Sequence, residues 1–148
     1  MKQTQDPAVF DGYAQLQLVS RGEIAVPISN TLGMERFDVE RGSVTVWLRP
    51  DAERHYNPIG SVRGGVISTL LDTAAACSVH STLAEGETYT SLDLTVKFLR
   101  AVTVDSGLLR CVGTVVQRGR RTALAQAQLF DAEDRLVAHA TSTCMIFE

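Results

Sequence analysis

The chain has 148 residues, of which 45% are hydrophobic and 21% charged, and its formal net charge is −3. This length suits one domain, residues 1–148, with its own hydrophobic core, and the composition excludes a disordered or fibrous chain. The negative net charge excludes an overall basic field that would attract nucleic acid or anionic lipid.

The cysteines and histidines show no pattern of a metal site. Cys77, Cys111 and Cys144 are far apart, odd in number and set in apolar stretches. We therefore expect reduced thiols, no metal and a cytoplasmic location. The first residues hold no apolar core of the signal-peptide type. Among the histidines, we expect His55 to lie exposed in a loop and His80 to pack within a helix.

Short and mixed segments precede the central part of the chain. Residues 1–23 predict an N-terminal extension with one short helix over residues 13–19. Residues 24–30 are ambiguous, because a proline and an asparagine there oppose a central strand. Residues 50–62 hold two of the four prolines and predict a loop that leads into the next segment.

The strongest pattern lies at residues 64–83, where two glycines open an apolar and almost uncharged segment. Apolar side chains surround a helix of period 3.6 on nearly all sides, which is typical of a central buried helix. Asp72 is the only carboxylate in the segment. Because burying an unpaired charge is costly, Asp72 is either functional or satisfied by nearby hydroxyls such as those of Thr69 and Thr73.

Alternation of apolar and polar residues predicts a hairpin before this helix and four strands after it. Short joins separate the strands, which is typical of antiparallel neighbours. The expected strands cover residues 34–40, 43–49, 88–101, 107–117, 122–130 and 136–147. The result is an α+β fold, in which a curled antiparallel sheet wraps around one long central helix and its open edges invite a partner subunit.

This architecture resembles the hotdog fold, and residues 57–65 followed by Asp72 resemble the active-site segment of hotdog-fold acyl-CoA thioesterases of the PaaI (phenylacetate-degradation) type. In that family an Asn, a Gly and then His-Gly-Gly open the central helix, and an acid follows eight residues after the first of the paired glycines. Here that glycine and acid are Gly64 and Asp72, and Arg63 stands where the family has His. Two later segments are also similar to the family, residues 118–123 and 136–141.

The resemblance implies an acyl-CoA thioesterase that hydrolyses an aryl- or medium-chain acyl-CoA to the free acid and CoA, with no metal or organic cofactor. Unpaired backbone N–H groups at Gly64 and Gly65 suit the polarisation of a thioester carbonyl, and Asn57 can add a side-chain amide. Asp72 suits a general base toward water or a nucleophile that forms a mixed anhydride, and the sequence leaves both roles open.

Further site residues are expected around the substrate. Ser91 or Thr90, at the start of the first strand after the helix, is expected to orient the water or Asp72. Arg63 cannot act as a general acid or base near neutral pH, but it can hydrogen-bond a carbonyl or attract a phosphate. With the resemblance, a clamp for the phosphates of CoA is expected at the turn Arg118, Gly119, Arg120 and Arg121.

The spacing of the site predicts self-association. Gly64 and Asp72 are eight residues apart, which is about 12 Å of rise on one helix. Both cannot easily reach one carbonyl, so we expect a homodimer of antiparallel copies with two shared sites, and the resemblance allows a homotetramer. Two alternatives stay open: a non-catalytic acyl-CoA-binding protein, and a hotdog hydratase or dehydratase acting on a thioester.

Overall fold

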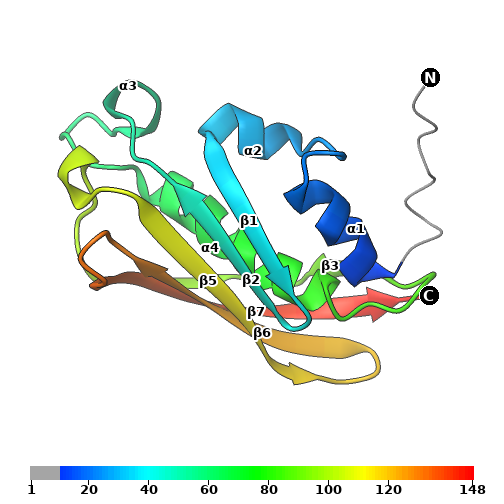
Figure 1. Ribbon diagram of the computed structural model, residues 1–148. Helices are drawn as coiled ribbons and strands as arrows, with labels where there is room; N and C mark the ends of the chain where they lie inside the picture. Colours follow the sequence, from blue (N-terminus) through cyan, green and yellow to red (C-terminus); the bar gives the residue numbers. More distant parts are fainter. Residues whose placement is uncertain (1–10) are drawn as a thin grey trace.

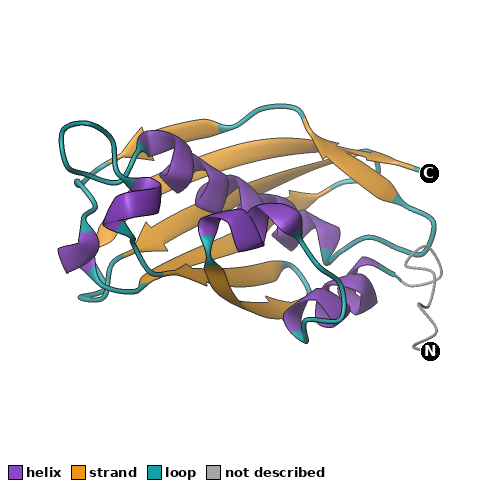
Figure 2. Ribbon diagram, turned by 90° about the horizontal axis from the view of Figure 1, so that it is seen from above, coloured by secondary structure: helices purple, strands orange, loops and turns teal. Residues whose placement is uncertain are grey.

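The computed structural model describes residues 11–148 and confirms the expected architecture. A seven-stranded antiparallel sheet curls around one long helix, α4 (Gly64–His80), as Figure 1 shows. The fold is therefore α+β and of the hotdog type. Seen from above in Figure 2, α4 runs across one face of the sheet.

The sheet has the order β1-β2-β5-β6-β7-β3, and β4 also pairs with β7. Every pairing is antiparallel, as the short joins predicted. The strands are β1 (Met34–Glu40), β2 (Ser43–Leu48), β3 (Thr88–Ser91), β4 (Thr95–Phe98), β5 (Leu109–Arg118), β6 (Thr122–Phe130) and β7 (Leu136–Phe147).

The single strand expected over residues 88–101 is in fact two strands, β3 and β4, which pair with successive parts of β7. Asp93 causes the interruption. Its carboxylate accepts a hydrogen bond from the backbone N–H of Thr143 at 2.7 Å, and its carbonyl accepts one from the Ser142 hydroxyl at 2.8 Å. A side chain thus replaces the backbone ladder, so the edge of the sheet is broken at this point.

Three short helices accompany the sheet. α1 (Gly12–Ser20) is the short helix expected near the N-terminus, and Asp11 caps it. α2 (Pro27–Leu32) fills the ambiguous segment, because its proline occupies a first-turn position and Gly33 ends it in the left-handed region. α3 (Ala52–His55) is a single turn within the expected loop, and a short 3-10 helix covers Val104–Ser106.

The core lies between α4 and the inner face of the sheet. A Cβ at Gly113 of β5 would lie 1.9 Å from the carbonyl oxygen of Ala74, so the helix and strand backbones are in direct contact. The face of α4 toward the sheet is buried at Ile67, Leu70, Leu71, Ala74, Ala75, Ser78 and Val79. The opposite face, which carries Asp72, is only half-buried, so the helix is not covered on all sides as its composition suggested. Among the described residues, no helix is long and apolar enough to span a membrane.

The expectation that His55 is an exposed loop residue is wrong, since its side chain is 1% exposed. Its Nδ1 accepts a hydrogen bond from the Asp51 backbone N–H at 2.9 Å, and its Nε2 therefore donates to the Leu32 carbonyl at 2.8 Å. The His55 carbonyl in turn accepts from the Arg63 N–H at 2.8 Å. His55 thus joins α2 and α3 to the start of α4, and its ring has no free nitrogen for catalysis.

Candidate active site

The N-terminus of α4 presents unpaired hydrogen-bond donors. Arg63 is the N-cap, and its side chain makes no capping hydrogen bond. The Arg63 carbonyl accepts from the N–H of Val66 at 3.0 Å, but within residues 11–148 the N–H groups of Gly64 and Gly65 have no acceptor. Two free donors at the positive end of a helix dipole can bind an oxyanion.

The two glycines differ in their surroundings. A Cβ at Gly64 would lie 2.9 Å from the ring of Phe98, whereas nothing lies within 4 Å of a Cβ built at Gly65. Gly65 is also exposed. A carbonyl therefore has open space at Gly65, whereas a Cβ at Gly64 would press on an aromatic ring.

Asp72 is half-buried on the open face of α4. The hydroxyls of Thr69 and Thr73 donate instead to the carbonyls of Gly65 and Thr69, at 2.8 and 2.7 Å. The described part of the chain supplies no hydrogen bond or ion pair to the Asp72 carboxylate. The two threonine hydroxyls that the sequence offered as its partners therefore do not bind it. Burial raises the pKa of Asp72 above its ordinary value of 3.8.

The groups around Asp72 are thiols and a phenol. Burial, and then the negative charge of Asp72, raise the pKa of the Cys77 thiol to about 12. Burial also raises the pKa of Cys144 and Tyr89, and the Asp72 charge adds to both shifts. These thiols are free and stay protonated near neutral pH, so neither is a reactive thiolate there.

Ser91 and Thr90 lie on opposite faces of the sheet. Ser91 pairs with Cys144, and its hydroxyl lies 3.9 Å from the Cys144 sulfur, on the face toward α4. Thr90 pairs with Met145, which points to the outer face. Of the two hydroxyls expected near the site, the structure thus places only Ser91 on the side of Asp72.

Asn57 organises the loop before α4. Its Oδ1 accepts hydrogen bonds from the N–H groups of Ile59 and Ser61, both at 3.1 Å. Its Nδ2 donates to the Ser61 hydroxyl at 3.0 Å. The amide expected at the carbonyl is therefore engaged within its own loop. Arg63, at the end of this loop, is exposed at the start of α4.

The arginine-rich turn divides into a structural arginine and two exposed ones. Arg118 donates to Glu87 at 2.9 Å, to the Thr82 hydroxyl at 3.2 Å and to the neighbouring Gly119 carbonyl. This half-buried ion pair ties the turn to the segment after α4. Arg118 is therefore committed to protein partners, in contrast to the expected phosphate clamp.

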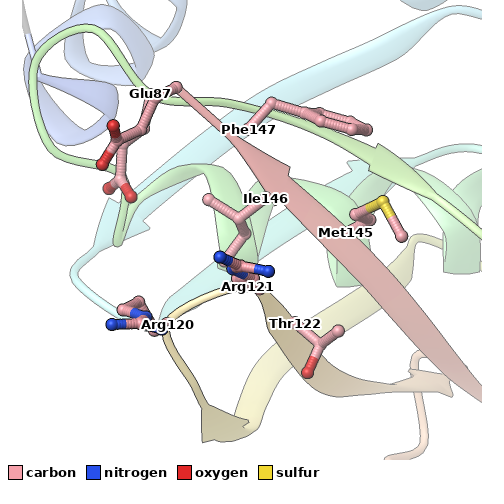
Figure 3. A pocket seen from close by; sticks show the side chains of 8 residues that line it. Glu87, Arg120, Arg121, Thr122, Met145, Ile146 and Phe147 are labelled. Atoms are coloured by element: carbon pink, nitrogen blue, oxygen red, sulfur yellow. The ribbon is translucent and has the colours of Figure 1, made fainter.

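Arg120 and Arg121 border a cavity of about 700 Å³ at the same end of the sheet. Figure 3 shows both side chains projecting from the turn between β5 and β6, with Glu87 on the other side of the cavity. Both arginines are exposed. They keep the positive charge that a clamp for phosphate needs.

These groups are spread along the whole length of α4. The helix has 17 residues, which is about 25 Å of rise. Gly64 lies at its first turn, Asp72 near its middle, and Arg118 contacts Thr82 just beyond its end. One chain therefore does not gather the oxyanion donors, the carboxylate and the arginines at one point.

Comparison with known proteins identifies one family and several similar proteins. The family model described as Thioesterase superfamily matches residues 59–138. The chain is 28% identical over 155 residues to the medium/long-chain acyl-CoA thioesterase YigI of Escherichia coli, covering 94% of this chain and 98% of that protein. A solved phenylacetic acid degradation-related protein from Ralstonia eutropha is 35% identical, with a TM-score of 0.75 and coverage of 87% and 97%. The PaaI protein of E. coli, 20% identical, shares the fold with a TM-score of 0.79 over 94% and 96% of the two chains.

The raised pKa of Asp72 predicts that Asp72→Asn increases the free energy of unfolding at pH 7. Because burial raises the pKa of Asp72, the folded state binds more protons than the unfolded state as the pH rises from about 4, and stability falls there. The asparagine side chain does not titrate, so the variant does not lose stability as the pH rises. Urea unfolding at pH 7 and about pH 3 measures the difference, which disappears at the lower pH where both states are protonated.

The exposed Asp105 provides the control, since Asp105→Asn removes a carboxylate that is not buried. A loss of stability for Asp72→Asn at pH 7 would show that the carboxylate has a stabilising partner.

Proposed function

The chain belongs to the thioesterase superfamily and is a thioester hydrolase, and on this premise we propose that it hydrolyses aryl- or medium-chain acyl-CoA thioesters to the free acid and CoA. The name of YigI supports the aliphatic substrates, and that of the Ralstonia protein supports the aryl substrates. The observation that carries the proposal is a half-buried Asp72 without a hydrogen-bond partner among the described residues, on the helix whose N-terminus holds free donors.

The N–H groups at Gly64 and Gly65 are proposed to bind the thioester carbonyl oxygen. Charge develops on that oxygen as the carbonyl carbon becomes tetrahedral, and fixed donors stabilise the transition state more than the ground state. The open space at Gly65 allows close approach of the oxygen to the backbone.

Asp72 is proposed to act on the carbonyl carbon in one of two ways. As a general base, it takes a proton from water while the hydroxide oxygen forms the new C–O bond. As a nucleophile, it forms an anhydride that water then hydrolyses. In both cases the C–S bond breaks, and the thiolate of CoA leaves and takes up a proton. Ser91, on the same side of the sheet, is proposed to orient the water or the carboxylate.

A hydratase is less well supported, because its chemistry usually needs a free histidine near the thioester. Both ring nitrogens of His55 are engaged by backbone groups. His80 is bonded to Gln15 at 2.7 Å and contacts Tyr89, so it packs in the helix as expected. His139 pairs with Gln128 and Lys97 on the outer face of the sheet.

The site is proposed to form between two antiparallel copies of the chain. Gly65 and Asp72 lie on the same face of α4, about 10 Å apart along its axis, so one carbonyl cannot contact both. The half-buried face of α4 is open to a second chain. An antiparallel partner brings the carboxylate of one helix to the N-terminus of the other.

The edges of the sheet support the same arrangement. Four charged residues, Glu35, Arg36, Asp38 and Glu40, protect the β1 edge, and α1 packs on that strand. The opposite edge, formed by β3 and β4, pairs only with β7 within the described chain. Two apolar residues beside these strands are exposed, Leu92 between β3 and β4 and Leu99 directly after β4. We propose that this edge contacts the partner subunit.

Arg120 and Arg121 are proposed to bind the phosphates of CoA, without Arg118.

Hydrolysis of the thioester needs only the substrate, water and the protein groups named above, so we propose no cofactor. The free thiols of the three cysteines suit a reducing compartment, and we propose that the enzyme acts in the cytoplasm.

The central test is release of free thiol from a panel of aryl- and alkyl-CoA thioesters by the wild type and Asp72→Asn. We expect loss of about 100-fold or more in kcat, because the amide keeps the size of the side chain but cannot act as base or nucleophile. Asp105→Asn is the matched control and should keep wild-type rates. A folded Asp72→Asn variant with undiminished turnover would exclude a catalytic role for this carboxylate.

Sharing of the site is tested with heterodimers purified from two differently tagged chains, one carrying Asp72→Asn and the other Gly65→Leu. Each homodimer should be inactive, because the leucine blocks approach to the helix N-terminus. The heterodimer keeps one site with both groups intact, so we expect about half of the wild-type activity per dimer. If Asp72 and Gly65 act within one chain, both sites are defective and the heterodimer is as inactive as the homodimers.

The arginine proposal predicts a phosphate-specific change in KM. Arg120→Ala/Arg121→Ala should raise KM for an acyl-CoA by about tenfold, since each charge-assisted hydrogen bond to phosphate contributes to binding. KM for the same acyl group on pantetheine, which lacks the nucleotide phosphates, should not change. Arg36→Ala is the control on the distant β1 strand. An equal rise in KM for both substrates would place the arginines elsewhere in the reaction.

A further inference from the structure

The side chain of Phe98 points toward α4 and is nevertheless exposed. Phe98 is the last residue of β4 and pairs with Ala138, which is buried on the face toward α4. Side chains at paired positions point to the same face of the sheet, so Phe98 also points toward α4. Its side chain is nevertheless 56% exposed, because β4 lies at the edge of the sheet.

The ring of Phe98 rests on the backbone at the start of α4. A Cβ at Gly64 would lie 2.9 Å from the Cζ atom of Phe98 and 3.4 Å from Cε1. Any side chain at position 64 would displace the ring. The aromatic ring thus lies beside the N–H groups proposed to bind the thioester carbonyl.

Gly64 and Phe98 also line a cavity of about 340 Å³. Its volume is in the range of small-molecule binding sites. The remaining lining is largely apolar, and consists of Val62, Ile67, Leu99, Ala101 and Val102, with Ser61 and Arg100. An apolar cavity that includes Gly64, one of the two proposed carbonyl-binding residues, suits the acyl part of a thioester rather than its charged nucleotide.

We infer that Phe98 determines which acyl groups the enzyme accepts. This inference rests on the proposed function and extends it to substrate choice. The ring, seated on Gly64, forms one wall of the acyl site and limits the size of the group that can lie beside the carbonyl. Its face also offers an apolar surface to the ring of an aryl substrate. Enlarging the site at this position should therefore favour larger acyl groups.

The test compares kcat/KM for hexanoyl-, decanoyl-, palmitoyl- and phenylacetyl-CoA in the wild type, Phe98→Ala and Phe98→Tyr. Phe98→Ala should raise the ratio of palmitoyl- to hexanoyl-CoA activity by about tenfold or more, the scale at which apolar pockets discriminate. Phe98→Tyr keeps the ring and should keep the wild-type ratio. Val116→Ala, at a residue that is also 56% exposed but lies outside the cavity, controls for loss of surface apolar area.

A wild type that hydrolyses acyl-CoA but shows the same ratios in Phe98→Ala would overturn the role of Phe98 and leave the proposed function intact. A wild type that releases no thiol from any substrate would overturn both.

The contact itself is tested by combining substitutions. Gly64→Ala should change the ratio of palmitoyl- to hexanoyl-CoA activity of the wild type by displacing the ring. In a Phe98→Ala background the same substitution meets no ring, so it should leave this ratio unchanged even where it lowers kcat for all substrates, because Gly64 is also a proposed carbonyl-binding residue. Equal effects of Gly64→Ala on this ratio in the two backgrounds would show that the ring does not act through this contact.

Discussion

The direct packing of α4 on the sheet determines which way the candidate site residues of this helix face. At Gly113 the strand has no room for a Cβ beneath the Ala74 carbonyl, so helix and strand backbones are in contact. The inner faces of β6 and β7 support this contact, because they carry a series of buried alanines in place of larger side chains. Close packing of this kind also fixes the rotation of the helix. One face is therefore committed to the core, and the face with Gly65 and Asp72 is turned away from it.

That orientation explains the unusual state of Asp72. The carboxylate is far enough inside to be desolvated, yet the described chain offers it no hydrogen bond or ion pair. The free donors of the helix lie a full seven residues away at Gly65, beyond the reach of the same substrate atom. A natural core can tolerate one such group, and sites for chemistry are where desolvated, unpaired carboxylates are retained. The structure therefore places a loss of stability at the residue that we propose carries out the chemistry.

Local patterns predicted the central helix, the hairpins and the position of Asp72, because hydrophobic period and short joins are properties of neighbouring residues. Residues whose state depends on distant partners were not predictable in this way. His55 is buried because a carbonyl in α2 lies beside it, and Arg118 is engaged because Glu87 approaches from the segment after α4. Asp93 interrupts a strand through bonds to β7, which no local pattern signals. Phe98 did carry a signal, since it continues the inward alternation of its strand, but its contact with Gly64 appears only in three dimensions.

The spread of functional groups along α4 has a consequence for both assembly and selectivity. In an antiparallel pair, two-fold symmetry brings the N-terminus of each helix toward the middle of the other, so both sites are completed by the same contact. Phe98 lies on β4, the edge strand proposed to meet the partner, and its ring lies against Gly64, the first of the two residues proposed to bind the oxyanion. The wall of the acyl site is thus part of the proposed interface. In the proposed dimer, any shift of β4 against its partner would move this wall relative to the carbonyl. We therefore expect the choice of acyl group and the stability of the dimer to depend on the same edge of the sheet.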